Sequence, residues 1–126
     1  MHEKLTKQFR FELGHHVMAE LSQCANVEIL SQSVLLLRAM TTAAEEAGLT
    51  VVHCQHYQFE PVGGSAVLLL SESHFSAHTW PEQATVAIDV FTCSDPTKAM
   101  NCVRVFSEIL KAQSVQLQQI PRGIYG

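Results

Sequence analysis

A serine, a histidine and a cysteine lie in one stretch of this chain at spacings that can support chemistry. Ser73 follows Glu72 just after the apolar run Val67–Leu70, His78 comes five residues later, and Cys93 lies further along the chain. A serine hydroxyl can attack a carbonyl carbon when an acid or base and a donor for the developing oxyanion lie nearby. A thiol, with an ordinary pKa of about 8.5, can transfer a proton. Each residue alone is more often structural, so the inference rests on the whole pattern.

The segment SESHFSAHTWPE, residues 71–82, and the segment IDVFTC, residues 88–93, resemble the self-cleaving, pyruvoyl-dependent S-adenosylmethionine decarboxylases of bacteria and archaea. The resemblance is strongest from Phe59 to Cys93 and weaker at Gly14–Glu20 and Arg122–Gly123. It implies that residues 1–126 form one decarboxylase domain. It also implies self-cleavage between Glu72 and Ser73 into residues 1–72, the β chain, and residues 73–126, the α chain.

The resemblance implies a cofactor made from the chain itself. Decarboxylation of an amino acid needs an electron sink that no natural side chain supplies, so a carbonyl cofactor is required. The Ser73 hydroxyl would attack the Glu72 carbonyl carbon and form an ester, and β-elimination would leave dehydroalanine, which hydrolyses to a pyruvoyl group and ammonia. Pyridoxal phosphate is disfavoured, because no lysine lies beside a glycine-rich phosphate cradle.

Roles in cleavage and proton transfer follow from the same resemblance. His78 matches the histidine that assists self-cleavage, although five residues along a strand would place it on the face opposite Ser73 unless the segment bends or bulges. Ser65 matches a serine that also assists cleavage. Cys93 matches the cysteine that returns a proton to the α-carbon of the substrate after carbon dioxide leaves.

Substrate-binding residues are implied in the same way. Phe59 and Trp80 match aromatic residues that sandwich an adenine ring, and stacking of this kind would also favour a nearby sulfonium. Glu82 matches a carboxylate that holds the ribose hydroxyls. Phe75 falls where the family usually has leucine or isoleucine lining the pocket. Each assignment has a structural alternative. Phe59 and Trp80 can instead pack in the core, and Glu82 can instead cap a turn.

Several positions depart from the usual pattern of the family. Ser94 replaces a glycine after the cysteine, Ala66 replaces a glycine after Ser65, and Ala77 replaces a larger aliphatic residue before His78. These changes alter pocket volume or backbone freedom without removing a reacting group. An arginine or ornithine decarboxylase of the same family is therefore an alternative, although a basic amino acid has no purine ring for two aromatic residues to stack on. An unprocessed regulatory paralogue is a second alternative.

No metal site is expected. The segment His53-Cys54-Gln55-His56 looks faintly like one, but on a strand the two histidines point to opposite faces, and zinc needs ligands that converge. His15 and His16 are ambiguous, because one of them can line the pocket while structural histidines are commoner.

The elements that must position these residues follow from the pattern of apolar side chains. The expected strands are Lys7–Leu13, Val17–Leu21, Thr50–Phe59, Ala66–Ser71, Thr85–Thr92 and Ser114–Ile120, with Gly14 interrupting the first two. The expected helices run from Asn26 to about Ala47 and from Asp95-Pro96 through Leu110. Short connections favour antiparallel pairing, so we expect an α+β, two-layer sandwich with two helices on one face of the sheet. The uncovered face favours a homodimer, and the resemblance implies an (αβ)₂ form with active sites at or near the interface.

Composition limits the remaining functions. The chain has 126 residues, of which 47% are hydrophobic and 16% charged, and this suits one compact domain. A net charge of −4 does not indicate the excess of basic residues that binds nucleic acid or an anionic membrane. No apolar run approaches the roughly 20 residues of a membrane-spanning helix, and residues 1–7 lack the apolar core of a signal peptide. Four scattered cysteines favour free thiols, so we expect a cytoplasmic enzyme with S-adenosylmethionine as its small-molecule partner.

Overall fold

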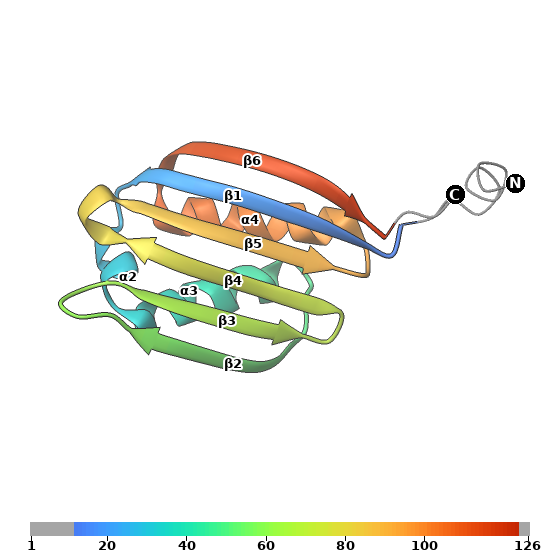
Figure 1. Cartoon of the computed structure of the whole chain (residues 1–126), viewed down its shortest axis with the longest axis horizontal. Helices are drawn as coiled ribbons and strands as arrows, with labels where there is room; N and C mark the ends of the chain where they lie inside the picture. The colour runs from blue at the N-terminus through green and yellow to red at the C-terminus, as the bar shows by residue number, and fades with distance from the viewer. Residues whose placement is uncertain (1–11, 124–126) are drawn as a thin grey trace, which may run out of the picture.

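The computed structural model describes residues 12–123, which form a six-stranded sheet with the helices packed on one of its faces (Figure 1). The strands are β1 (Gly14–Cys24), β2 (Val51–Gln58), β3 (Gly64–Leu70), β4 (Ser73–Trp80), β5 (Thr85–Thr92) and β6 (Ala112–Arg122). The helices are α2 (Val27–Ser31), α3 (Ser33–Glu46) and α4 (Pro96–Leu110), with a short 3₁₀ turn, η1 (Pro81–Gln83). No helix in this part of the chain is long and apolar enough to cross a membrane.

The sheet has the strand order β2-β3-β4-β5-β1-β6, and each neighbouring pair is antiparallel. Side chains of the central strands alternate between a covered face, packed on the helices, and an open face. In β5, for example, Val86, Ile88 and Val90 are buried beneath the helices, while Asp89 between them faces away. The prediction of an α+β fold with an antiparallel sheet and helices on one face is confirmed.

The predicted helix over residues 26–47 is two helices. Gln32 interrupts it with an extended backbone, at φ −125° and ψ 120°. The break leaves polar backbone groups free at both helix ends, and the Gln58 side chain from β2 satisfies them. Its Oε1 accepts a hydrogen bond from Ser33 N–H (2.7 Å), and its Nε2 donates to Ser31 O (3.0 Å). Apolar spacing alone does not reveal a one-residue break, because Leu30 and Leu36 on either side are both buried.

The N-terminal strands and β4 also differ from expectation. Residues 7–11 of the predicted strand Lys7–Leu13 lie outside the described residues. Gly14 starts β1 rather than interrupting a strand, and the predicted piece Val17–Leu21 lies within that strand. We predicted no strand between Ser71 and Glu82, yet β4 occupies most of it and pairs with both β3 and β5. Its alternation is present but weak, because the residues that face away from the helices are histidines, a serine and a tryptophan.

Candidate active site

The Glu72–Ser73 peptide lies at the turn between β3 and β4. Ser73 pairs with Thr92 at the end of β5, and the Glu72 carbonyl oxygen accepts a hydrogen bond from the backbone N–H of Cys93 (3.2 Å). The Ser73 hydroxyl is buried and makes no hydrogen bond to any described residue. An unpaired buried polar group costs about 1–3 kcal/mol, so it needs a functional explanation. A free hydroxyl next to a carbonyl that already has an N–H donor is the arrangement expected of a nucleophile and its target.

Cys93 is held at this turn by its neighbours. The buried Thr92 hydroxyl accepts a hydrogen bond from Ser94 N–H (3.0 Å) and lies 2.9 Å from the Ser94 hydroxyl. These contacts fix the backbone on both sides of Cys93, whose thiol is free and whose residue is exposed. The structure therefore brings Glu72, Ser73 and Cys93 together, and we call these three residues the cleavage end of the sheet.

Ser65 and His78 form a second group. They are direct cross-strand partners in β3 and β4, and both face the open side. They line a cavity of about 410 Å³ on this face. Its lining residues are Gln55, His56, Tyr57, Ser65, Ala66, Val67, Ser76 and His78.

His78 does not approach Ser73 within one chain. β4 pairs in unbroken register with β5 from Ser73 to Trp80, so the bend or bulge that would bring the two side chains to one face is absent from this strand. Ser73 has the parity of the buried Phe75, on the covered face, and His78 is exposed on the open face. At about 3.3 Å per residue, five residues separate their backbones by roughly 16 Å.

Phe59, Trp80 and Glu82 lie at the other end of the sheet, which we call the aromatic end. Trp80 is the last residue of β4, with 43% of its surface exposed, and Glu82 lies in η1. Phe59 follows β2 and packs at Gly63, where an added Cβ would lie 3.5 Å from Phe59 Cδ2 and 3.2 Å from Pro81 Cδ. Seven residues of β4 separate Ser73 from Trp80, which is about 23 Å. One chain therefore holds the two ends apart.

The Phe75 side chain is part of the core. It is fully buried and packs edge to face against Phe106 of α4, with ring centroids 5.3 Å apart. Its direction follows from β4 alternation, because Phe75 lies on the same side as the buried Ala77. The Phe75 side chain thus points away from the cavity on the open face. The Phe75 backbone pairs with the neighbouring strands, which continue to the cleavage end.

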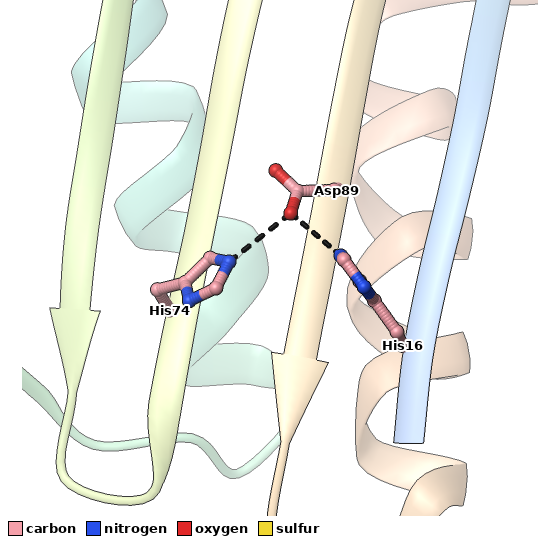
Figure 2. Close-up of side chains that lie close together, drawn as sticks. All are labelled: His16, His74 and Asp89. Carbon is pink, nitrogen blue, oxygen red and sulfur yellow. Dashed lines mark hydrogen bonds and ion pairs between the residues drawn. The ribbon is translucent and has the colours of Figure 1, made fainter. Parts of the chain in front are cut away.

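A polar network that the sequence did not reveal lies beside the cleavage end on the open face (Figure 2). His16 of β1 and His74 of β4 both direct Nε2 at the same oxygen, Asp89 Oδ2 of β5, at 2.7 and 3.0 Å. The Ser76 hydroxyl donates to Asp89 Oδ1. Burial raises the pKa of Asp89, but the hydrogen bonds from Ser76, His16 and His74 outweigh it and leave this pKa below its usual range. β1 is far from β4 and β5 in sequence, and the register of the three strands brings these residues together.

The residue types of this network are those of a metal site, but its nitrogen and oxygen atoms are already hydrogen-bonded to one another. The nearest nitrogen and oxygen atoms of His16, His74 and Asp89 lie within 4.8 Å of one another. Arg122 NH1, which can only donate, lies 2.9 Å from His16 Nδ1. His16 Nδ1 is therefore the acceptor, and its Nε2 carries the proton that is donated to Asp89. A protonated ring nitrogen does not ligate a metal, so this tautomer opposes metal binding.

The His53–His56 segment behaves as strand geometry requires. His56 Nδ1 lies 2.8 Å from the Ser33 hydroxyl, at the break between α2 and α3. His53 pairs across to Leu69, which faces the open side. The two imidazoles therefore point to opposite faces, as predicted.

His15 lies at the start of β1. Its pKa is raised by hydrogen bonds to Gln119 (2.8 Å) and to Glu12 (3.1 Å), which outweigh the lowering effect of burial.

Comparison with known proteins gives the same family for the sequence and for the structure. The sequence profile of the S-adenosylmethionine decarboxylase family matches residues 15–123. An S-adenosylmethionine decarboxylase proenzyme of Thermosipho melanesiensis is 40% identical over 113 residues, which cover 90% of this chain and 86% of that protein. The proenzyme of Pelotomaculum thermopropionicum is 39% identical over 112 residues, covering 89% and 88% of the two chains. The crystal structure of the adenosylmethionine decarboxylase from Aquifex aeolicus superimposes with a TM-score of 0.85 at 32% identity, covering 91% of this chain and 94% of that one.

Proposed function

Because this chain belongs to the S-adenosylmethionine decarboxylase family, we propose that it is a self-processed enzyme that removes the carboxylate of S-adenosylmethionine. The decarboxylated product would supply aminopropyl groups for spermidine synthesis. The observation that carries the proposal is the Glu72–Ser73 peptide, where an unpaired buried hydroxyl adjoins a carbonyl held by the Cys93 N–H. The free state of all four cysteines fits a reducing compartment, and we place the reaction in the cytoplasm.

Self-cleavage begins with attack of Ser73 Oγ on the Glu72 carbonyl carbon. Negative charge then develops on the Glu72 oxygen, where the Cys93 N–H is already in place as a donor. Loss of one such donor typically slows acyl transfer by 10²–10³-fold. The Ser73 amine leaves and an ester remains. β-Elimination releases the Glu72 carboxylate and leaves dehydroalanine at position 73, which water converts into a pyruvoyl group and ammonia.

The residues of the cleavage end fit the cofactor that this reaction would leave at position 73. A pyruvoyl carbonyl supplies the electron sink that decarboxylation requires. The Cys93 thiol is then the available acid, because Cys93 is exposed and directly follows Thr92, the residue of β5 that pairs with position 73. We assign it the proton that replaces the lost carboxylate on the α-carbon. At the aromatic end, Phe59 and Trp80 would bury the purine between their rings, and Glu82 would accept hydrogen bonds from the ribose hydroxyls.

A complete site requires a second copy of the chain. The aromatic end lies about 23 Å from Ser73 along β4, too far for one nucleoside to bridge with its amino-acid group at position 73. The open face carries exposed apolar side chains at Tyr57, Val67 and Leu69, an arrangement typical of an interface. We infer that two chains pack open face to open face, in opposite directions, as an (αβ)₂ homodimer. The partner's Ser65 and His78 would then approach the Glu72–Ser73 peptide from the open face and assist its cleavage.

Mixed dimers test this division of the site. A Ser73→Ala chain lacks the nucleophile and a His78→Ala chain lacks the assisting imidazole, so neither should cleave when expressed alone. In a co-expressed heterodimer, the His78→Ala chain supplies Ser73 and its partner supplies His78. The expected result is cleavage of the His78→Ala chain only in the mixture. Equal failure of the mixture and of the separate variants would contradict a shared site.

The substrate is tested by release of labelled carbon dioxide. Carboxyl-labelled S-adenosylmethionine, arginine and ornithine are incubated in parallel with the cleaved wild-type protein, and the Ser73→Ala chain serves as the blank. We expect release from S-adenosylmethionine alone, and a KM that rises at least tenfold in Trp80→Ala because the purine loses one stacking face. Release from arginine or ornithine instead would assign the function to the basic amino-acid decarboxylases. A wild-type chain that stays uncut would favour a regulatory paralogue.

A further inference from the structure

His74 has an unusual position in the molecule. Its backbone nitrogen forms the peptide bond to Ser73, and its ring projects from β4 onto the open face with 41% of the side chain exposed. The ring stacks on Phe91, at 5.9 Å between centroids and an interplanar angle of 27°. Nε2 contacts Asp89, while Nδ1 makes no hydrogen bond within residues 12–123. An imidazole with one nitrogen held and the other free is the arrangement of a proton carrier.

The protonation of this ring follows from its partners. Asp89 is ionised, because three hydrogen bonds lower the pKa of its carboxyl group despite partial burial. An ionised carboxylate only accepts hydrogen bonds, so His74 Nε2 must bear the proton. Neutral His74 therefore presents the lone pair of Nδ1 on its exposed side. An ionised Asp89 also stabilises the imidazolium that forms when Nδ1 takes up a proton.

The residues behind Asp89 fix its orientation. Arg122 of β6 donates to His16 Nδ1, and His16 Nε2–H donates to Asp89, so two successive hydrogen bonds link Arg122 to the carboxylate. Arg122 also lies over the Phe91 ring, 5.7 Å from its centroid, and His16 packs edge to face on that ring. His16 of β1 and Asp89 of β5 therefore lie next to His74, and Leu69 of β3 is its cross-strand partner. Arg122 of β6 contacts His16 and the Phe91 ring. No competing carboxylate among the described residues contacts the imidazole.

We propose that His74 is a proton-transfer residue of the decarboxylase reaction and that Asp89 is the positioning residue that sets its tautomer. The proposal deepens the function proposed above and rests on it. An amino-acid substrate arrives with a protonated α-ammonium group, which cannot bond to a carbonyl carbon until it loses a proton. His74, one residue along the chain from position 73, takes that proton at Nδ1, which frees the lone pair of the substrate nitrogen. The resulting imidazolium is paired with Asp89 and later passes the proton to water.

The test compares two variants with a matched control. His74→Gln keeps a hydrogen-bond donor toward Asp89 but cannot take up a proton, and Asp89→Asn removes the charge that holds the tautomer. His53→Gln is the control, because His53 lies in the same cross-strand row through Leu69, on the edge strand β2 and away from the carboxylate. Intact mass reports cleavage in each variant. Reductive trapping with cyanoborohydride then reports the rate at which substrate mass is added to the α chain, independently of carbon dioxide release.

The expected results separate proton transfer from a structural role. All variants should cleave, trapping should slow by about 10²-fold in His74→Gln, and His53→Gln should stay within about twofold of wild type. Trapping in His74→Gln should recover toward wild type as pH rises, because alkaline solution frees the substrate amine without a base. Nitrogen-15 NMR should show His74 protonated at Nε2 in the wild type and a mixture of tautomers in Asp89→Asn.

Three results would overturn this inference while leaving the proposed function intact. The first is a cleaved His74→Gln variant that traps substrate within about threefold of wild type at neutral pH. The second is a His74 ring protonated at Nδ1. The third is one equivalent of zinc in the wild type that is absent from Asp89→Asn, which would make the network a metal site. An uncleaved wild-type chain would instead overturn the proposed function and this inference together.

Discussion

Replacing Phe75 by leucine separates a core role from a binding role at a position where the resemblance implies a pocket. Phe75 is fully buried against Phe106 in an edge-to-face pair. Loss of such a pair costs about 0.5–1.5 kcal/mol beyond the buried area. The smaller side chain also leaves a void, and since Phe→Ala costs about 3–5 kcal/mol, we assign about 1 kcal/mol to the partial truncation. Phe75→Leu should therefore reduce the free energy of unfolding by about 2 kcal/mol.

Unfolding is measured with urea or heat in the Ser73→Ala background, so that one uncut species is present, and at one protein concentration, because dimers gain stability with concentration. For a domain of this size, 2 kcal/mol corresponds to a fall in Tm of roughly 6–10 °C. Phe106→Leu should cost a similar amount, and the double variant should cost less than the sum by about the energy of the ring pair. The KM of the cleaved Phe75→Leu enzyme should stay within about twofold of wild type. An unchanged Tm together with a raised KM would refute the core assignment.

Three further predictions follow from local contacts. In the native protein, Cys93 should react with a maleimide while Cys102 does not, because burial raises the pKa of the Cys102 thiol to about 12; equal labelling before unfolding would contradict this. Gln58→Ala should reduce the free energy of unfolding by about 1–3 kcal/mol, since it leaves Ser33 N–H without its acceptor and Ser31 O with only the hydrogen bond from Gly63 N–H, whereas Gln55→Ala on the same strand should have little effect in a urea titration. Asp89 has a lowered pKa in the fold, so its ionised form stabilises the protein above the unfolded carboxyl pKa of about 3.9, and that contribution is lost as pH falls through the folded pKa. The stability difference between wild type and Asp89→Asn should thus be largest near neutral pH and vanish in acid; a constant difference would refute the ionised network.

The parts of the fold that followed from sequence are those with a strong local signal. The alternation in Thr85–Thr92 predicted the bounds of β5 as the structure has them. Proline after Asp95 predicted the start of α4, where the Asp95 carboxylate accepts a hydrogen bond from Thr97 N–H. Both signals are contained within a few residues, so no tertiary information was needed.

The parts that did not follow depend on contacts between distant residues. β4 was missed because its apolar alternation is diluted by the polar residues of the open face, His74, Ser76 and His78. The break at Gln32 depends on Gln58, which is distant in sequence. The Asp89 network joins three strands through their register, and a shift of one residue in any pairing would turn its side chain away. The alternation of β5 nevertheless contained one usable signal, a carboxylate on the face opposite the core.

The separation of the cleavage end from the aromatic end has the same origin. Motif spacing placed Ser73, His78, Trp80 and Glu82 close together in sequence. The interior strand β4 spreads Ser73, His78 and Trp80 along its length and over both faces of the sheet, and Glu82 follows in η1. Proximity in sequence is therefore a poor guide to proximity in space within a strand. The family resemblance supplied the residues, and their separation within one chain is the reason for our proposal that a second copy completes the site.

The central claim, that Ser73 becomes the cofactor, is tested most directly by an intact mass spectrum of the purified, non-reduced protein. The chemistry proposed above predicts two fragments, residues 1–72 ending in an ordinary Glu72 carboxylate and residues 73–126 beginning with a pyruvoyl group. The Ser73→Ala chain should give one uncut mass. A single wild-type chain with an unmodified Ser73 would contradict the claim and remove the electron sink from the proposed reaction.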